Sequence, residues 1–313
     1  MYHYVRDFKV QRYPNIKGLD IELFRQQLKF LKSRFTIIRM EDLLFALGGK
    51  NLPENAALLS FDDGYIDHYT TVFPLLDKMG LQGSFFPPCS NLESQVLLDV
   101  NKIHFTLASS NAVDLYRAVL YKINSHRGTE FDIPDTETLL KEYFMPNRFD
   151  SGEVAFIKQM LQTILPQRLR KLIIDELFRE FVSVDEAVLA KELYCDVEQL
   201  ITMKKRGMFI GLHGFNHYWL GNMEKHDYEK DICHSLDYMD SMGLIDKRAW
   251  VMCYPYGSWN DGVVEFIQAN GCLAGLTTEV GVAKLLTTNR FLLPRLDTND
   301  FPPKSENYLK LQG

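Results

Sequence analysis

The stretch AALLSFDDGY, residues 56–65, sets an apolar run directly before two adjacent aspartates and a glycine. The short apolar run predicts a buried strand. Neighbouring side chains of a strand point to opposite faces, so Asp62 and Asp63 reach one site only if the chain leaves the strand there. Gly64 permits that departure, because it has no Cβ to restrict the backbone. We therefore expect a strand that ends in a carboxylate pair.

This carboxylate pair has two interpretations. Two carboxylates a few ångströms apart repel each other, and a metal ion beside them relieves the repulsion. Alternatively, one aspartate caps the helix that follows Gly64 and its neighbour is solvated. The pair alone does not decide between a metal site and a helix cap.

Short apolar runs alternate with amphipathic segments on both sides of this stretch, which indicates a parallel sheet with crossover helices. The helical pattern is clearest at residues 21–35 and 68–80. Strands are predicted at residues 35–40, 56–61, 82–88, 208–213, 250–257 and 272–278. We therefore expect an α/β fold.

The alternation stops between residues 95 and 200, where the apolar period is almost entirely helical. This segment predicts an inserted helical subdomain or a lid. We expect a discontinuous main domain of residues 1–94 and 201–313 and a helical insertion of residues 95–200.

Composition excludes several classes of protein. The 313 residues are 46% hydrophobic and 24% charged, as in ordinary globular chains. The net charge is −6, and no Lys/Arg block is long enough to follow a nucleic acid. No apolar stretch reaches the roughly 18 to 20 residues that span a bilayer, and residues 1–14 lack the pattern of an export signal. We expect no nucleic-acid partner, no transmembrane segment and a cytoplasmic location, at most peripheral to a membrane.

A second predicted strand end carries two histidines. In GLHGFNHYWLG, residues 211–221, His213 and His217 stand four residues apart. This spacing lets two imidazoles reach one ion from a helical turn or a tight loop. Two histidines and one carboxylate, with positions open to water and substrate, form the ligand set of a catalytic metal. The third strand end, VMCYPYGSWN at residues 251–260, predicts a rigid turn at its proline and glycine.

Together these stretches resemble the polysaccharide deacetylase family, also called the NodB-homology or carbohydrate esterase 4 family. SFDDGY is similar to the first motif of the family, HGFNH to the second and YPYG to the end of the third, in the same order. The resemblance covers residues 50–94 and 205–300 and extends to MYHYV at the start of the chain. It implies a distorted (β/α)7 TIM-like barrel and metal-dependent hydrolysis of an N-acetyl group from an amino sugar.

The resemblance also implies roles for individual residues. Asp63, His213 and His217 would hold the metal ion, and Asp62 would be the base that deprotonates the attacking water. The backbone N–H of Tyr256, in the turn begun by Pro255, would bind the oxyanion. Zinc is the ion expected first, and the same ligand set accepts cobalt, nickel or iron.

Two residues of the family pattern are missing. No histidine follows His234, although the family takes its general acid from a late L-x-H motif. We predict that His3 replaces it, because the first strand of a closed barrel lies beside the last one. His68 is the alternative donor.

The arginine of the third motif, which orients the base, is also missing, because Met252 stands in its place. We predict that Arg295, at the end of the apolar run in LLPRLD, reaches Asp62 instead, with Asp297 as a partner.

The expected substrate is an N-acetylated carbohydrate. The apparent lack of an export signal favours a biosynthetic intermediate, such as a lipid-linked or nucleotide-linked sugar. Two alternatives remain: a metal-dependent amidase that acts on a cyclic amide, and a relative that binds a carbohydrate without cleaving it. The sequence predicts no oligomeric state.

Overall fold

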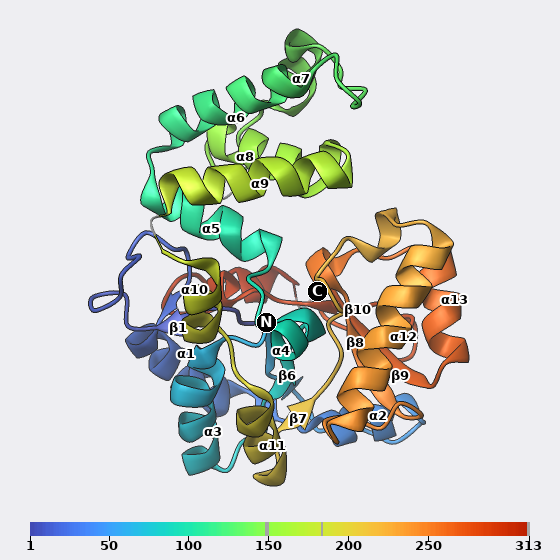
Figure 1. Ribbon diagram of the computed structural model, residues 1–313. Coiled ribbons are helices and arrows are strands. Elements are labelled where there is room, and N and C mark those ends of the chain that lie inside the picture. The colour runs from blue at the N-terminus through green and yellow to red at the C-terminus, as the bar shows by residue number, and fades with distance from the viewer. Residues whose placement is uncertain (148–149, 183, 312–313) are drawn as a thin grey trace. The chain divides into compact units, whose positions relative to one another are not determined.

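A computed structural model describes residues 1–147, 150–182 and 184–311 (Figure 1). The chain divides into two compact units. The first comprises Met1–Asp7, Gly18–Val96 and Ala190–Gly313, and the second comprises Phe8–Lys17 and Leu97–Leu189. Residues 8–17 thus group with the second unit and residues 190–200 with the first, which differs from the expected division. The assignment of the units as a barrel and an insertion stays a prediction.

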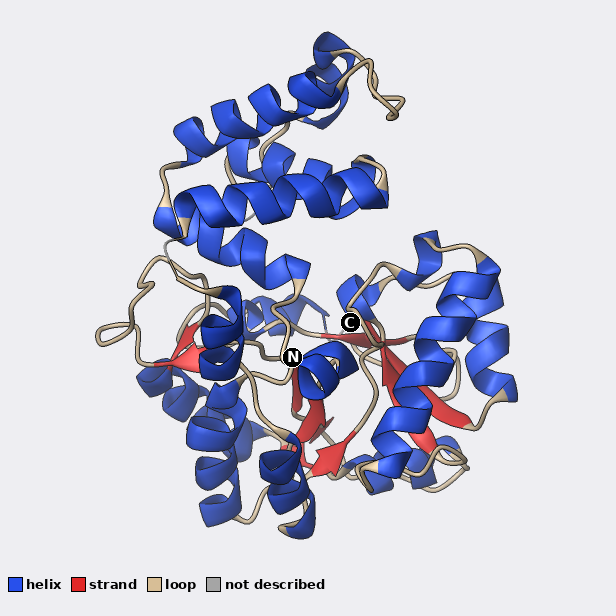
Figure 2. Ribbon diagram, viewed as in Figure 1, coloured by secondary structure: helices blue, strands red, loops and turns tan. Residues whose placement is uncertain are grey.

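The named strands all lie in the first unit, and their pairings are parallel (Figure 2). One three-stranded sheet has the order β5 (Ser60–Asp62), β6 (Ser84–Phe86), β7 (Phe209–Ile210), and another has the order β10 (Leu293–Arg295), β9 (Cys272–Val280), β8 (Trp250–Cys253). Two-stranded sheets pair β1 (Val5–Arg6) with β2 (Leu19–Asp20) and β3 (Thr36–Ile37) with β4 (Ala56–Ala57). The α/β class is confirmed, whereas these separate sheets do not establish a (β/α)7 barrel.

Single contacts link the separate sheets. Tyr2 forms a parallel bridge with Phe61 of β5, and Leu212, just after β7, forms one with Met252 of β8. At the other edge the amino group of Met1 donates to the carbonyl of Leu296, just after β10, at 2.7 Å. Since these pairings are parallel, the carboxyl ends of β5, β7, β8 and β10 point the same way.

Helices cover the sheets of the first unit. They are α1 (Ile21–Arg34), α2 (Met40–Leu47), α3 (Phe73–Met79), α4 (Cys89–Ser94), α11 (Val197–Lys205), α12 (Lys225–Ser241) and α13 (Asp261–Ala269). Helix α1 shows why they form where they do. The Asp20 side chain accepts the backbone N–H of Glu22, and Phe24, Leu28 and Leu31 form one buried stripe.

Several predicted elements differ in their bounds, and three of them show why. The strand expected at residues 35–40 is only β3, because α2 already begins at Met40. The strand expected at residues 56–61 is split into β4 and β5, whose partners are different strands. The helix expected at residues 68–80 opens with a π-helical turn, His68–Val72, before α3. Pro74 lacks the N–H that would continue the α-helical bonding through this point.

The second unit is helical, as its period predicted. Its helices are α5 (Asp99–Ser109), α6 (Ala112–His126), α7 (Thr136–Tyr143), α8 (Gly152–Gln159) and α9 (Gln167–Phe181), and a π-helical turn, Met160–Ile164, follows α8. Helix α10 (Glu186–Leu193) spans the point where the chain passes back to the first unit. The second unit has its own hydrophobic core, which includes Leu115, Val119, Ile123, Phe156 and Ile173.

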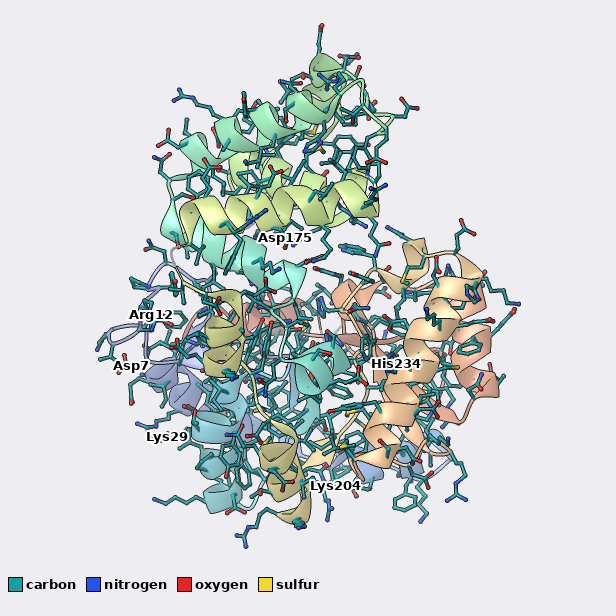
Figure 3. All side chains as sticks on the ribbon, viewed as in Figure 1. Asp7, Arg12, Lys29, Asp175, Lys204 and His234 are labelled. Atoms are coloured by element: carbon teal, nitrogen blue, oxygen red, sulfur yellow. The ribbon has the colours of Figure 1, made fainter. Side chains whose placement is uncertain are left out.

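A buried lysine lies within this helical unit. The Lys102 side chain is 3% exposed, and its Nζ lies 2.6 Å from Asp175 Oδ1 and 2.9 Å from Glu186 Oε2. Asp175 is labelled on α9 in Figure 3. The two carboxylates supply the pairing that a buried ammonium requires. Among the described residues, no helix is both long and apolar enough to cross a membrane.

Candidate active site

The two aspartates lie where β5 ends. Asp62 is the last residue of the strand, and Asp63 has left it with a φ of 74°. Gly64 follows with a φ of 65°, and a Cβ there would lie 2.7 Å from Pro87 Cβ. Both carboxylates are buried. The helical conformation begins at Ile66, directly after Tyr65, so neither aspartate of the pair is the capping residue and the helix-cap interpretation is wrong.

Asp63, His213 and His217 converge as predicted. Asp63 Oδ1 lies 3.3 Å from His213 Nε2 and 3.2 Å from His217 Nε2. One ligand atom from each of the three buried residues lies within 4.8 Å of the others. The histidine spacing works through a tight loop rather than a helix, because His217 has a φ of 57°.

The donor chemistry fits a metal ion. His213 Nδ1 lies 2.6 Å from the carbonyl of Cys253, so this nitrogen carries the proton and Nε2 presents its lone pair. The Tyr65 hydroxyl donates to Asp63 Oδ2 at 2.7 Å. Within the described part of the chain, Asp63 Oδ1 and His213 Nε2 are buried and make no hydrogen bond. One carboxylate oxygen and the imidazoles are therefore left to hold a divalent ion.

The protonation state of Asp63 agrees with this role. Burial raises the pKa of Asp63, but the close approach of the His213 and His217 rings more than offsets burial and holds the pKa well below its usual range. A carboxylate that stays ionised is the form that binds a metal.

Arg295 holds the second aspartate. Its Nη1 donates to Asp62 Oδ1 at 2.9 Å, and its Nη2 lies 2.8 Å from Asp62 Oδ2. The guanidinium also donates from Nε to the carbonyl of Thr277 at 2.7 Å and from Nη1 to Ser60 Oγ at 3.0 Å. Burial raises the pKa of Asp62, yet the charge and hydrogen bond of Arg295, together with the nearby His3 and His213, outweigh burial and keep the pKa below its usual range.

The contact predicted between Arg295 and Asp62 is thus present, and β10 supplies the arginine that β8 lacks. Met252, at the position of the family arginine, is fully buried in the hydrophobic core. Asp297, predicted as a partner of Arg295, instead accepts the backbone N–H of Asn299 at 2.8 Å and caps the turn Thr298–Asp300.

The two candidate acid histidines have different surroundings. His3 Nε2 lies 3.9 Å from Asp62 Oδ2, and its side chain is 41% exposed. His68 is buried, and its Nε2 lies 2.9 Å from the backbone carbonyl of His3. Burial lowers the pKa of His68 to about 4, so the ring is neutral and Nε2–H donates to that carbonyl. The structure therefore brings His3 to the edge of the site and keeps His68 behind it.

The turn after β8 lies beside the metal ligands. Pro255–Gly257 form a short 3₁₀ turn in which Tyr256 adopts a left-handed φ of 56°. The Tyr256 ring meets the His217 ring edge to face, with centroids 4.5 Å apart. Thr278 Oγ1 of β9 donates to the Tyr256 carbonyl at 3.1 Å. Asp63, His217 and Tyr256 all have positive φ, a strain that concentrates at functional sites.

Two supporting residues were not predicted. Asp231 of α12 accepts the backbone N–H groups of Phe215 at 2.7 Å and Asn216 at 3.3 Å, which fixes the loop between the two histidines. The sequence did offer one signal for Asp231, because a carboxylate on the buried face of a helix needs a polar partner. For Tyr65, nothing in the sequence except its position after Gly64 indicated that its hydroxyl donates to Asp63.

Comparison with known proteins finds one family model that matches part of the chain. Residues 180–274 match the family model described as polysaccharide deacetylase. The predicted family resemblance is confirmed. The matched segment contains the histidine motif and the Tyr256 turn, whereas the aspartate motif precedes it. No curated protein matches the chain in sequence.

Several solved structures share the fold. The Streptococcus pyogenes deacetylase PplD, solved in complex with acetate, is 18% identical with a TM-score of 0.60, covering 100% of this chain and 96% of its own. A de-N-acetylase from Aggregatibacter actinomycetemcomitans is 17% identical with a TM-score of 0.57 and coverages of 98% and 97%. IcaB from Ammonifex degensii is 17% identical with a TM-score of 0.53 and coverages of 97% and 93%. The shared fold therefore includes helical residues that lie outside the sequence motifs.

Proposed function

We propose that the protein is a metal-dependent hydrolase that removes the N-acetyl group of an amino sugar in a polysaccharide or its precursor. The observation that carries this proposal is that two adjacent aspartates at the end of β5 have different partners. Asp62 is held by Arg295, and Asp63 faces two imidazoles. One aspartate is thereby suited to proton transfer and its neighbour to metal binding.

Asp63, His213 and His217 would hold the ion, which is most consistent with zinc, although cobalt, nickel and iron suit the same ligands. A bound divalent ion supplies Lewis acidity, which lowers the pKa of water and polarises a carbonyl. Tyr65 and the carbonyl of Cys253 orient two of the ligands through their hydrogen bonds.

Asp62 takes the proton of the attacking water. Its ionised form is available because Arg295 keeps its pKa low, and the two contacts to the guanidinium fix the plane of the carboxylate. A general base needs this positioning more than it needs an unusual pKa when the water is already acidified.

His3 donates the proton to the departing amine. The amine must leave protonated, and His3 is the histidine whose ring nitrogen approaches Asp62 from a partly exposed position. His68 holds the backbone carbonyl of His3 and so positions it. The backbone N–H of Tyr256, after Pro255, binds the oxyanion, supported by the left-handed turn that places Tyr256 beside His217.

We also propose that the first unit is a distorted (β/α)7 barrel. Hydrogen bonding runs from Tyr2 through β5, β6 and β7, across the bridge between Leu212 and Met252 to β8, β9 and β10. The contact between Met1 and Leu296 returns to the start, which supports a closed ring of seven segments.

The decisive experiment combines metal content with acetate release. Native protein, Asp62→Asn and the exposed control Asp237→Asn are assayed against N-acetyl sugars, nucleotide-linked sugars and cyclic amides. We expect about one equivalent of metal in each protein, with acetate release lost only in Asp62→Asn. Turnover of cyclic amides alone would identify a non-sugar amidase, and sugar binding without release would identify a non-catalytic relative. Cell fractionation tests the predicted cytoplasmic location.

A further inference from the structure

The loop that carries the histidines is stacked on the turn that carries Tyr256. We call residues 213–221 the metal loop and residues 254–260 the oxyanion turn. The indole of Trp219 lies parallel to the Tyr256 ring, with centroids 4.6 Å apart and planes 11° apart. The same tyrosine ring meets His217 of the metal loop edge to face at 4.5 Å. Tyr256 thus contacts two aromatic residues of the metal loop.

Hydrogen bonds join the same two segments. The backbone N–H of Gly221 donates to Ser258 Oγ at 3.0 Å, and Asn260 Nδ2 donates to the carbonyl of Gly221 at 2.9 Å. A Cβ on Gly221 would lie 2.4 Å from the carbonyl oxygen of Trp259. Only glycine allows the backbones to approach this closely, so the contact between the segments is specified in the sequence.

Both segments also hold a strained residue. His217 has a φ of 57° and Tyr256 a φ of 56°, and left-handed conformations of this kind cost about 1–2 kcal/mol for residues other than glycine. Such conformations persist only where surrounding contacts impose them. The ring stack and the hydrogen bonds of Gly221 are contacts of this kind.

We propose that Trp219 and Ser258 are positioning residues that fix the distance between the metal ligands and the oxyanion N–H of Tyr256. This inference rests on the proposed function, since it assigns the Tyr256 N–H to the oxyanion. Trp219 acts through Tyr256, and its effect falls on the transition state, where the oxyanion forms. Metal binding depends chiefly on other contacts: the Tyr65 hydroxyl on Asp63, the Cys253 carbonyl on His213 and the Asp231 carboxylate on the loop between the histidines.

The test replaces the indole in two ways. Trp219→Leu removes the stack, whereas Trp219→Phe keeps an aromatic face. The phenylalanine sacrifices no hydrogen bond, because Trp219 Nε1 makes none within the described residues. Trp259→Leu is the matched control, because Trp259 lies on the oxyanion turn and is 39% exposed. The readouts are kcat, KM, metal content and hydrogen–deuterium exchange of residues 254–258.

We expect Trp219→Leu to lower kcat about 10–100-fold, with metal content and KM near native and faster exchange in the oxyanion turn. Trp219→Phe recovers most of kcat, Ser258→Ala shows a smaller loss, and Trp259→Leu stays near native. Native kcat with native exchange in Trp219→Leu would overturn the inference, as would metal loss in proportion to activity. If the native protein released no acetate, the proposed function would fail, and unchanged exchange in Trp219→Leu would still separately refute the tie between the segments.

Discussion

Arg295 contacts both carboxylate oxygens of Asp62, with Nη1 2.9 Å from Oδ1 and Nη2 2.8 Å from Oδ2. Arg295→Met should therefore lower acetate release on the order of 100-fold while metal content stays near native. Arg295→Lys should recover little, because an ammonium cannot make the two-point contact. The exposed arginine in Arg248→Met serves as the control.

Misfolding is the competing explanation for a loss in Arg295→Met, because it leaves Asp62 as an unpaired buried charge at a cost of about 3–5 kcal/mol. The double variant Arg295→Met/Asp62→Asn removes that charge. Urea unfolding should show recovered stability in the double variant, with activity still absent. Full activity in either protein would rule out the orienting role.

Replacing each of the two neighbouring aspartates should have a different effect on metal content. Asp63→Ala removes a ligand, so both metal and activity should be lost, whereas Asp62→Asn should keep metal and lose activity. Metal analysis after dialysis, paired with acetate release, separates the two outcomes. Removing metal from the native protein with a chelator should abolish activity, and added zinc should restore it. Equal metal loss in both variants would contradict the division of roles.

Replacing His3 and replacing His68 should also have different effects on turnover. His3→Ala should reduce kcat about 10²–10⁴-fold with metal retained, as expected for loss of a general acid. His68→Leu should reduce kcat less, because it removes only the hydrogen bond to the His3 carbonyl. Turnover by His3→Ala at the native rate, or a larger loss in His68→Leu, would reverse the assignment.

Asp231 provides a test of the loop between the metal histidines. Asp231→Asn keeps the shape but replaces one carboxylate oxygen with an N–H₂ group that cannot accept from Phe215 or Asn216. We expect metal affinity to fall about 10–100-fold, measured by competition with a chromogenic chelator. Asp237→Asn, on the same helix with a side chain 67% exposed, should bind metal as the native protein does. Native affinity in Asp231→Asn would show that the loop holds its shape without this contact.

The Lys102 pair predicts a pH-dependent stability of the helical unit. Burial raises the pKa of Asp175, but the hydrogen bond and charge of Lys102 outweigh it, so the pKa lies below its usual value. Stability from this pair is therefore present above about pH 4, near the unfolded pKa, and is lost as the pH falls through the folded pKa. Lys102→Met should cost about 1–3 kcal/mol in urea unfolding at pH 7, and the difference from native should shrink in acid.

Lys171→Met is the matched control for this pair. Lys171 Nζ lies 3.2 Å from the same carboxylate, but its side chain is 56% exposed. An exposed ion pair contributes about 0–1 kcal/mol, so this variant should unfold close to the native protein. Equal losses in the two lysine variants would mean that burial of Lys102 has no effect.

Sequence reasoning succeeded where a short segment carries its own chemistry. The alternation of apolar runs predicted the α/β class, and the aspartate and histidine motifs predicted the cluster of Asp63, His213 and His217. Partners distant in the chain were harder to predict. Asp62 and Arg295 are 233 residues apart, and the prediction of their contact required the family pattern and its missing arginine.

Supporting groups were not predicted because their roles depend on tertiary packing. Nothing near Asp231 in the sequence indicates that its carboxylate meets the backbone between two histidines of a distant loop. The stack of Trp219 on Tyr256 likewise depends on the close approach of Gly221 to the Trp259 backbone, which exists only in the folded protein. Strand bounds failed at residues 56–61 for a similar reason, because partner choice divides one apolar run into two strands.

The base Asp62 is approached by His3 from the start of the chain and by Arg295 from the last strand. A ribosome releases these groups in order, so a nascent chain displays the metal-binding residues well before it can restrain the base. A chain that stops before Arg295 lacks this guanidinium, so the contacts around the base are complete only once β10 is present.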